Sequence, residues 1–267
     1  FYHATVLGLR SRDEITGDIE RDDLGSFIHA VLRNYFAGKK GMQLRESDMA
    51  VGRMDQIIED LFDKEYGSDP SGALYLLKRQ IKRQMSAVLT DYYVPLVNKK
   101  VVSITGIEEK IEVRVDSFNL TGRLDSVERR DDKTIIVDFK TGSNQKYLRI
   151  DMEKLDLEKR DTWDNAIGSL QLPFYLLLYT EKKKMPIDEL DALFLLLGRC
   201  GINEGMELPL FHGSSPSEIY VSLKMVIFKL LREITDPLIP FSSADDRKRV
   251  CPKCDFQYIC GTQWVVR

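Results

Sequence analysis

The sequence predicts an α/β fold with a helical portion at its N-terminal side. Apolar residues recur at helical spacing before residue 93, alternating or wholly apolar runs follow between residues 102 and 141, and helical spacing returns after residue 163. With 267 residues, of which 43% are hydrophobic, the chain is long enough to bury a sizeable core.

The helical portion contains three predicted helices. The first begins near Asp22 or Asp23, either of which can cap it, and ends near Phe36. An acidic helix over residues 46–66 and a longer helix over residues 73–92 follow. The outer face of this longer helix is predicted to be basic and consists of Lys78, Arg79, Lys82 and Arg83.

Strands are predicted to dominate between residues 102 and 141. Residues 107–115 alternate between apolar and polar, and Glu109 falls on the apolar face, which is unusual for a solvated acid. A hairpin turn is predicted over residues 129–133. The strand after that turn is apolar on both faces, so it is predicted to lie in the centre of the sheet.

Three charged residues interrupt these buried strands. Asp125 precedes the hairpin turn, while Asp138 and Lys140 follow it two residues apart and therefore project to the same face. Hairpin pairing would place Asp125 beside Asp138. Because a buried unpaired charge is costly, this group indicates a divalent-metal site with a cationic helper, an arrangement suited to phosphodiester hydrolysis. For an isolated Asp-x-Lys pair, an ion pair that only holds the sheet is the alternative.

The rest of the chain is predicted to complete one α/β domain. Four further elements are expected: a polar helical or loose stretch over residues 151–159, a helix over 163–180 that includes Pro173, a buried strand over 190–198, and a helix over 217–234. The domain is expected to have three portions: a helical one over residues 1–100, an α/β core over 101–235 and a cysteine-containing tail over 236–267.

The ordered motifs resemble a known family. Gly-x-x-Asp ending at Asp125, then twelve residues, then Asp-x-Lys-Thr-Gly starting at Asp138 resembles the PD-(D/E)xK nuclease superfamily, and within it the RecB/AddB-like branch of helicase-associated nucleases. His29, Gln171 and Tyr175 of Gln-Leu-Pro-Phe-Tyr, and a C-terminal cysteine cluster extend the resemblance over essentially the whole chain. It implies a restriction-endonuclease-like mixed central sheet flanked by helices.

The resemblance also implies roles for individual residues. His29, Asp125, Asp138 and the backbone carbonyl of Phe139 would bind Mg²⁺ or Mn²⁺. Lys140 would orient or activate the attacking water and stabilise the developing charge on the phosphate. His3 and His212 have no such context.

Other candidate residues have more than one interpretation. Gln171 and Tyr175 lie four residues apart on one helical face; either Tyr175 is simply core, or it orients Gln171, which hydrogen-bonds near the active site or the phosphate. Glu109 is either an additional acid of the site or a partner for backbone groups. The basic helical face is either a solvated surface or a contact surface for DNA.

Cys251, Cys254 and Cys260 have the spacing C-x2-C-x5-C, which indicates metal or cluster binding in a chain without an export signal. In the resemblance such a tail holds a [4Fe–4S] cluster, whose fourth cysteine would fall before Phe1. The site is therefore expected to be incomplete in this chain, with its thiolates free, oxidised or zinc-bound. Cys200 would replace the missing ligand only if the fold brought it near the tail.

The predicted function is that of a metal-dependent DNA nuclease, an exonuclease, in DNA repair or recombination within a helicase–nuclease protein or complex. The alternative is a catalytically inactive nuclease-fold module that binds DNA or docks a helicase; a net charge of −3 argues mildly against a pure DNA-binding module. No apolar run reaches the roughly 20 residues of a membrane span, so a cytoplasmic protein without membrane contact is expected. The missing initial Met indicates a fragment of a longer protein.

Overall fold

The computed structural model describes residues 2–8, 21–142, 145–199, 205–211, 215–241 and 247–265. The chain forms two compact units: a larger one, Glu20–Phe228, and a smaller one composed of Phe1–Ile19 and Lys229–Arg267. The expected single domain with its three portions remains a prediction.

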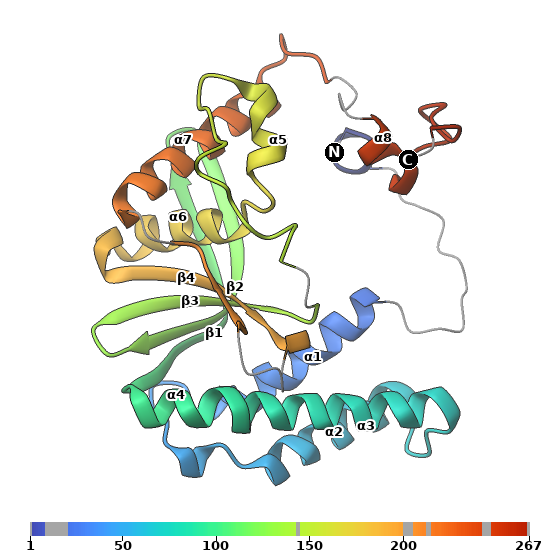
Figure 1. The fold of residues 1–267 in the computed structure, drawn as a ribbon, viewed down its shortest axis with the longest axis vertical. Helices are drawn as coiled ribbons and strands as arrows, with labels where there is room; N and C mark the ends of the chain where they lie inside the picture. The colour runs from blue at the N-terminus through green and yellow to red at the C-terminus, as the bar shows by residue number, and fades with distance from the viewer. Residues whose placement is uncertain are drawn as a thin grey trace. The chain divides into compact units, whose positions relative to one another are not determined.

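The larger unit is built around one mixed sheet (Figure 1). Its five strands lie in the order β1-β2-β3-β4-β5 and are β1 (Val102–Val115), β2 (Phe118–Arg130), β3 (Lys133–Lys140), β4 (Leu190–Leu196) and β5 (Glu207–Pro209). Strands β1 to β3 are antiparallel, β4 runs parallel to β3, and β5 is antiparallel to β4. The predicted α/β fold with a mixed central sheet is therefore confirmed.

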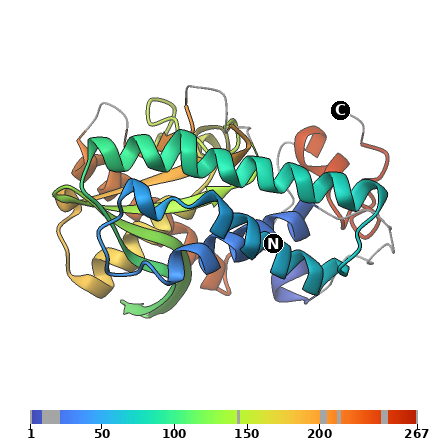
Figure 2. The same ribbon diagram turned by 90° about the horizontal axis from the view of Figure 1, so that it is seen from below.

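Helices cover both sides of this sheet. They are α1 (Arg21–Ala37), α2 (Val51–Tyr66), α3 (Gly72–Ala87), α4 (Val94–Lys99), α5 (Trp163–Ala166), α6 (Gln171–Lys183) and α7 (Pro216–Thr235); the smaller unit adds α8 (Arg247–Val250). Helices α1 to α4 lie on one side and α6 on the other, and Figure 2 looks onto α3, in teal, crossing in front of the sheet. None of the helices in the described residues has the length and hydropathy of a membrane span.

The main core lies between the sheet and the first helices. Ile135, Val137 and Phe139 of β3 pack with buried residues of α1, α2 and α3. The central position predicted for β3 is confirmed, because β2 and β4 flank it. Burying these apolar side chains is the main stabilising contribution to this layer, at about 25 cal/mol per Å² of apolar surface.

Several boundaries differ from the sequence predictions. The helix expected to end near residue 92 continues through a π-helical turn, Val88–Tyr93, into α4. The helix expected over residues 163–180 is broken between α5 and α6, so Pro173 lies in the first turn of α6, where its missing N–H breaks no helical hydrogen bond. Arg130, expected in a turn, pairs with Lys133 inside the sheet, because the turn contains only Asp131 and Asp132.

Candidate active site

The candidate site lies where β3 ends beside α1 and α6. His29 comes from α1, Asp125 from β2, Asp138 and Lys140 from β3, and Gln171 from the start of α6. Ser126 pairs with Val137, so the next residues of the two strands, Asp125 and Asp138, lie side by side as the hairpin pattern predicts. The structure thus brings together five residues that are up to 142 positions apart in the chain.

His29 connects α1 to the ends of two strands. Its Nδ1 lies 3.4 Å from Asp125 Oδ1, and its Nε2 lies 3.0 Å from the backbone oxygen of Phe139, to which it can donate a hydrogen bond. The Phe139 N–H donates to Asp125 Oδ2 over 2.8 Å. The hydrogen bond to Asp125 raises the pKa of His29 even though partial burial acts in the opposite direction.

Gln171 connects β3 to α6. Its amide Nε2 donates to Asp138 Oδ1 (2.7 Å) and to the Tyr175 hydroxyl (2.9 Å), and its Oε1 accepts from Lys140 Nζ (2.7 Å). Lys140 Nζ also lies 2.7 Å from Asp138 Oδ2. Tyr175 is therefore in contact with this network through the amide of Gln171. Its role in orienting Gln171 remains a prediction.

Asp138 is 1% exposed, whereas the side chain of Lys140 is 28% exposed. Burial raises the pKa of Asp138 to about 6, and the neighbouring Asp125 carboxylate acts in the same direction, while Lys140 acts against it. The two acids therefore repel each other in a site that opens to solvent on the lysine side. Such crowding of acids is typical of a site that holds a cation.

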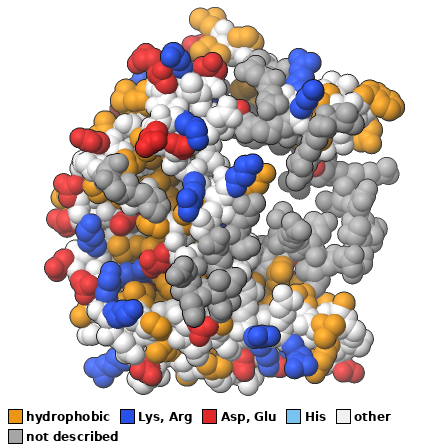
Figure 3. Space-filling model, in the orientation of Figure 1, with side chains coloured by type: hydrophobic (Ala, Val, Ile, Leu, Met, Phe, Trp, Pro, Cys, Tyr) orange, Lys and Arg blue, Asp and Glu red, His pale blue; other side chains and the backbone are white. Residues whose placement is uncertain are grey.

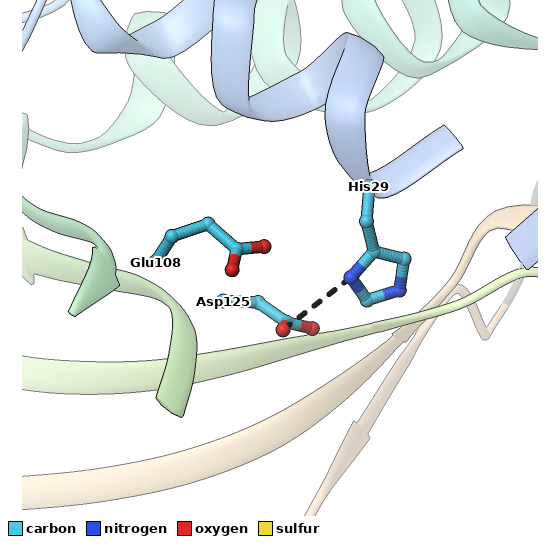
Figure 4. A group of neighbouring side chains, drawn as sticks. All are labelled: His29, Glu108 and Asp125. Carbon is cyan, nitrogen blue, oxygen red and sulfur yellow. Dashed lines mark ion pairs between the residues drawn. The ribbon is translucent and has the colours of Figure 1, made fainter. Parts of the chain in front are cut away.

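Glu108 is a site residue that the sequence did not reveal. Its carboxylate, the Asp125 carboxylate and a ring nitrogen of His29 offer ligand atoms that all lie within 4.8 Å of one another. Figure 4 shows the Glu108 carboxylate pointing into the space between His29 and Asp125, with a dashed line for the ion pair between the latter two. The pairs Ile107↔Ser126 and Glu109↔Leu124 flank Glu108 and Asp125, which places the two acids opposite each other.

Glu109, the acid singled out by the sequence, lies outside this cluster and forms an ion pair with Lys183 of α6 over 2.8 Å. Glu108 has a φ of 46°, in the left-handed region, which breaks the alternation of faces along β1. As a result, Glu109 Oε2 lies only 2.6 Å from the position that a Cβ on Gly106 would take. Gly106 and Glu109 therefore share a face of the sheet although they are three residues apart. Simple alternation fails at this residue.

The close packing of α6 against β2 requires a glycine at position 122. A Cβ there would lie 2.5 Å from Leu178 Cδ1 and 3.5 Å from the ring of Tyr175. The Gly-x-x-Asp pattern therefore lets α6, which carries Gln171, approach β2 closely beside Asp125.

The donor set fits a hard divalent cation. Two carboxylates and one imidazole are within reach of a single ion, and the Phe139 oxygen, which His29 contacts, lies beside them. Oxygen-rich sites with one imidazole suit Mg²⁺ and Mn²⁺. The network of Asp138, Lys140 and Gln171 adjoins this donor set through Asp125.

The basic helical face is only partly exposed, which corrects the expectation that all four residues point outward. Lys78 is 9% exposed, lies 3.0 Å from Asp63 and also forms an ion pair with Glu59, which pairs with Lys82 as well. These contacts join α3 to α2. Arg79 and Arg83 are exposed.

The cysteine tail belongs to the smaller unit. Cys251, Cys254 and Cys260 form no disulfide, and within the described residues they do not converge as a group of three metal ligands. His3, for which the sequence offered no context, has its Nε2 3.3 Å from Cys260 Sγ. Cys200 and His212 lie outside the described residues.

Comparisons with known proteins agree with this geometry. The PD-(D/E)XK nuclease superfamily model matches residues 1–261. Part of the chain is similar to a protein of Clostridium perfringens (strain SM101 / Type A) that is named as a subunit of an ATP-dependent helicase/deoxyribonuclease, with 25% identity over 172 residues, 54% of this chain and 14% of the relative. The protein of the same name from Clostridium kluyveri (strain NBRC 12016) is 24% identical over 166 residues, with the same coverage.

The chain thus spans 14% of the length of these relatives. A solved structure titled "Crystal structure of SSO0001" is 15% identical, covers 90% of this chain and 96% of its own, and has a TM-score of 0.26, which is too low to bear on the fold. The family match is different, because it extends over nearly the whole chain and includes every strand and the residues gathered at their ends. This chain belongs to the PD-(D/E)XK nuclease superfamily.

Proposed function

We propose that the chain is the nuclease part of a metal-dependent deoxyribonuclease that hydrolyses phosphodiester bonds in DNA. The observation that carries the proposal is the convergence of His29, Glu108, Asp125, Asp138 and Lys140 beside the end of β3. The family match supports the reaction class, and the names of the relatives support DNA as the substrate.

His29, Glu108 and Asp125, joined by Asp138 and the Phe139 carbonyl, would hold Mg²⁺ or Mn²⁺. When bound, such an ion supplies an activated water and neutralises charge on the phosphate. The chain's own contribution is to fix these donors: the Phe139 N–H holds one oxygen of Asp125, and His29 reaches the Phe139 carbonyl on the same peptide segment.

Lys140 would act on the reacting phosphate. Asp138 and Gln171 hold its ammonium group, so it can orient the attacking water and stabilise negative charge as that charge grows on the phosphoryl oxygens. The attacking water gives up a proton to the solvent as its oxygen forms a bond to phosphorus, and the bond from phosphorus to the leaving oxygen breaks. The leaving oxygen takes up a proton from the solvent, so the products are a phosphate monoester and a free hydroxyl.

We infer a partnership with a helicase, in the same protein or in a complex, because the relatives are named as subunits of a helicase/deoxyribonuclease. We also propose an exonuclease role in DNA repair or recombination, in the cytoplasm, which rests on the resemblance of the motifs. The three cysteines would supply three of the four thiolates of a [4Fe–4S] site.

DNA contacts outside the reacting phosphate would be local. Basic and acidic side chains are interspersed over the face in Figure 3, and the net charge is −3. Arg79 and Arg83 of α3 are the exposed members of the basic helical face and are the first candidates for phosphate contacts.

The test is cleavage of end-labelled single-stranded and double-stranded DNA with Mg²⁺, Mn²⁺ or EDTA. The proposal expects cleavage that requires the metal and is lost in Asp138→Ala. Binding of DNA without any cleavage under all metal conditions would contradict it and would favour an inactive DNA-binding module.

A further inference from the structure

The segment between β3 and α6 contains a small clip beside the candidate site. Residues 149–151 lie antiparallel to residues 166–168: the Gly168 N–H donates to the Arg149 carbonyl (2.9 Å), the Asp151 N–H donates to the Ala166 carbonyl (2.8 Å), and Ile150 bridges to Ile167. This pairing gives an otherwise irregular connection a defined backbone.

The clip requires glycine at position 168. A Cβ there would lie 2.7 Å from the Arg149 oxygen and 2.8 Å from the backbone carbon of Tyr147. The backbone of Tyr147 is thus packed against Gly168, which precedes Gln171 by three residues, a span of at most about 10 Å. The Ser169 hydroxyl accepts a hydrogen bond from the Gln171 N–H (3.2 Å) and so helps join the clip to the start of α6.

Two aromatic residues of this segment have opposite environments. Trp163 is 3% exposed, and its indole N–H donates to the Asp156 carbonyl over 2.8 Å, so it anchors the segment. Tyr147 is 63% exposed. Its ring therefore contributes little to the core, although its backbone is held in place next to the candidate site.

One cationic group lies near this exposed ring, and a second follows in the chain. Lys146 Nζ lies 6.0 Å from the ring centroid, and Arg149, whose guanidinium donates to the Gln145 side chain over 2.5 Å, follows two residues after Tyr147. Proteins bind single-stranded nucleic acid with exposed aromatic rings and cationic side chains, because a ring stacks on a base while the cations contact phosphates.

We infer that Tyr147 stacks on a base of a single DNA strand entering the candidate site, with Lys146 and Arg149 near the adjoining phosphates. The inference rests on the proposed function and adds a substrate class to it. Inside a duplex both faces of each base are already covered by neighbouring bases, whereas a single strand offers open base faces along its whole length.

The experiment uses single-stranded DNA in which one abasic position is moved stepwise along the strand. For the wild-type chain, loss of the base that meets Tyr147 should slow cleavage about tenfold, the effect of removing one stacking interaction. Tyr147→Ala should slow cleavage of intact DNA by a similar factor and should be insensitive to that abasic position. Tyr147→Phe keeps the ring and should behave like the wild type.

Tyr258→Ala is the matched control, because Tyr258 is 75% exposed and lies in the cysteine tail; it should keep the wild-type abasic pattern. The same comparison is made for binding by fluorescence anisotropy in the Asp138→Ala background, with and without Tyr147→Ala. If the wild type cuts no DNA, the proposed function fails, and the binding series still decides on Tyr147. An abasic pattern that is identical with and without the tyrosine ring would overturn the inference.

Discussion

Two charged clusters lie on the same strand, β2, and they differ in how completely their charges are satisfied. Asp125 belongs to the candidate active site. Three residues further along, Glu128 is completely buried and accepts hydrogen bonds from Arg130 (2.7 Å) and from the Tyr93 hydroxyl (3.0 Å). Arg130 donates to Glu207 of β5 (2.6 Å) and to the Tyr92 hydroxyl (2.7 Å) as well.

The second cluster, composed of Tyr92, Tyr93, Glu128, Arg130 and Glu207, is called the closed cluster because its charges pair with one another. The side chains of Arg130 and Glu128 are 5% and 0% exposed, and Arg130 also pairs with Glu207, which is 39% exposed at the rim. In the candidate site the acids instead crowd together, and burial and the neighbouring Asp125 raise the pKa of Asp138 to about 6. The comparison indicates that buried charge with fixed opposite partners holds the sheet, whereas crowded acids are available for a cation.

The largest expected effect concerns the open cluster, which is the group of His29, Glu108, Asp125, Asp138 and Lys140 in the candidate site. Asp138→Ala or Lys140→Ala should lower metal-dependent DNA cleavage by about 1000-fold or more, because Asp138 would hold the metal ion and Lys140 would act on the reacting phosphate. In Asp138→Ala the free energy of unfolding should change little, since the substitution also relieves the repulsion with Asp125. Cleavage rates under single-turnover conditions and urea melts measure the two effects, and a variant that cuts at nearly the wild-type rate would show that the site is wrongly assigned.

The closed cluster should respond in the opposite way. Glu128→Ala leaves Arg130 without its best-buried partner and should reduce the free energy of unfolding by about 3–5 kcal/mol. The cleavage rate of the fraction that remains folded should stay close to that of the wild type. Urea denaturation and activity per folded molecule give the result, and Tyr93→Phe, which removes one hydrogen bond, should cost only about 1 kcal/mol.

The sequence predicted more of the secondary-structure elements than of the residues in the candidate site. Strand β1 and helices α1, α3 and α7 follow from periodicity, because each is long enough to show its repeat. Strand β2 follows from the hairpin, and β3 and β4 follow from their apolar runs. Strand β5 has three residues, too few for alternation to be visible, and its place at the sheet edge depends on long-range pairing with β4. The single-domain organisation remains a prediction.

The residues of the candidate site also divide into those that the sequence placed and those that it did not. Asp125, Asp138 and Lys140 could be placed from strand pairing, and the resemblance supplied His29 and Gln171, which lie far away in the sequence. Glu108 could not be found, since a single left-handed residue shifts the facing of β1. The charge of Lys78 led to the prediction of an exposed side chain, but Lys78 faces α2, where it pairs with Glu59 and Asp63.

Glu108 and Glu109 are neighbours in the chain, but only Glu108 lies in the candidate site, so a pair of variants sharpens the comparison. Glu108→Gln removes a charged donor and should weaken Mn²⁺ binding by about tenfold, with a parallel rise in the metal concentration needed for cleavage. Glu109→Gln, which affects only the ion pair with Lys183, should bind Mn²⁺ like the wild type. Isothermal titration of both variants decides, and equal affinities would remove Glu108 from the site.

Metal binding should depend on pH through the protonated acids of the open cluster. The pKa of Asp138 in the folded chain, about 6, lies above its unfolded value, and the pKa of His29 is raised as well, chiefly by Asp125. Asp138 therefore contributes stability that is present below about pH 4 and is lost as the pH rises to about 6. The contribution of His29 is present below about pH 6.5 and is lost as the pH rises further, through its raised pKa. A cation competes with these protons.

Thermal melts without and with Mn²⁺ at pH 5.5 and 7.5 should consequently show a larger rise in Tm at pH 7.5, of a few degrees at saturating metal. His29→Ala should reduce that rise, and high Mn²⁺ should restore part of it. An equal Tm rise at both pH values would mean that neither Asp138 nor His29 has to lose a proton for the metal to bind.

The smallest expected effect concerns the exposed arginines of α3, which are part of neither cluster. Replacing Arg79 and Arg83 with Gln should weaken DNA binding for all sequences alike and reduce the slope of log affinity against log salt by up to about two, one for each arginine that no longer neutralises a phosphate. Lys82→Gln is the matched control on the same helix: its ammonium is already paired with Glu59, so the slope should stay at its wild-type value. If the double arginine variant also keeps the wild-type slope, this face is only solvated, and the strand must be held by residues nearer to the candidate site.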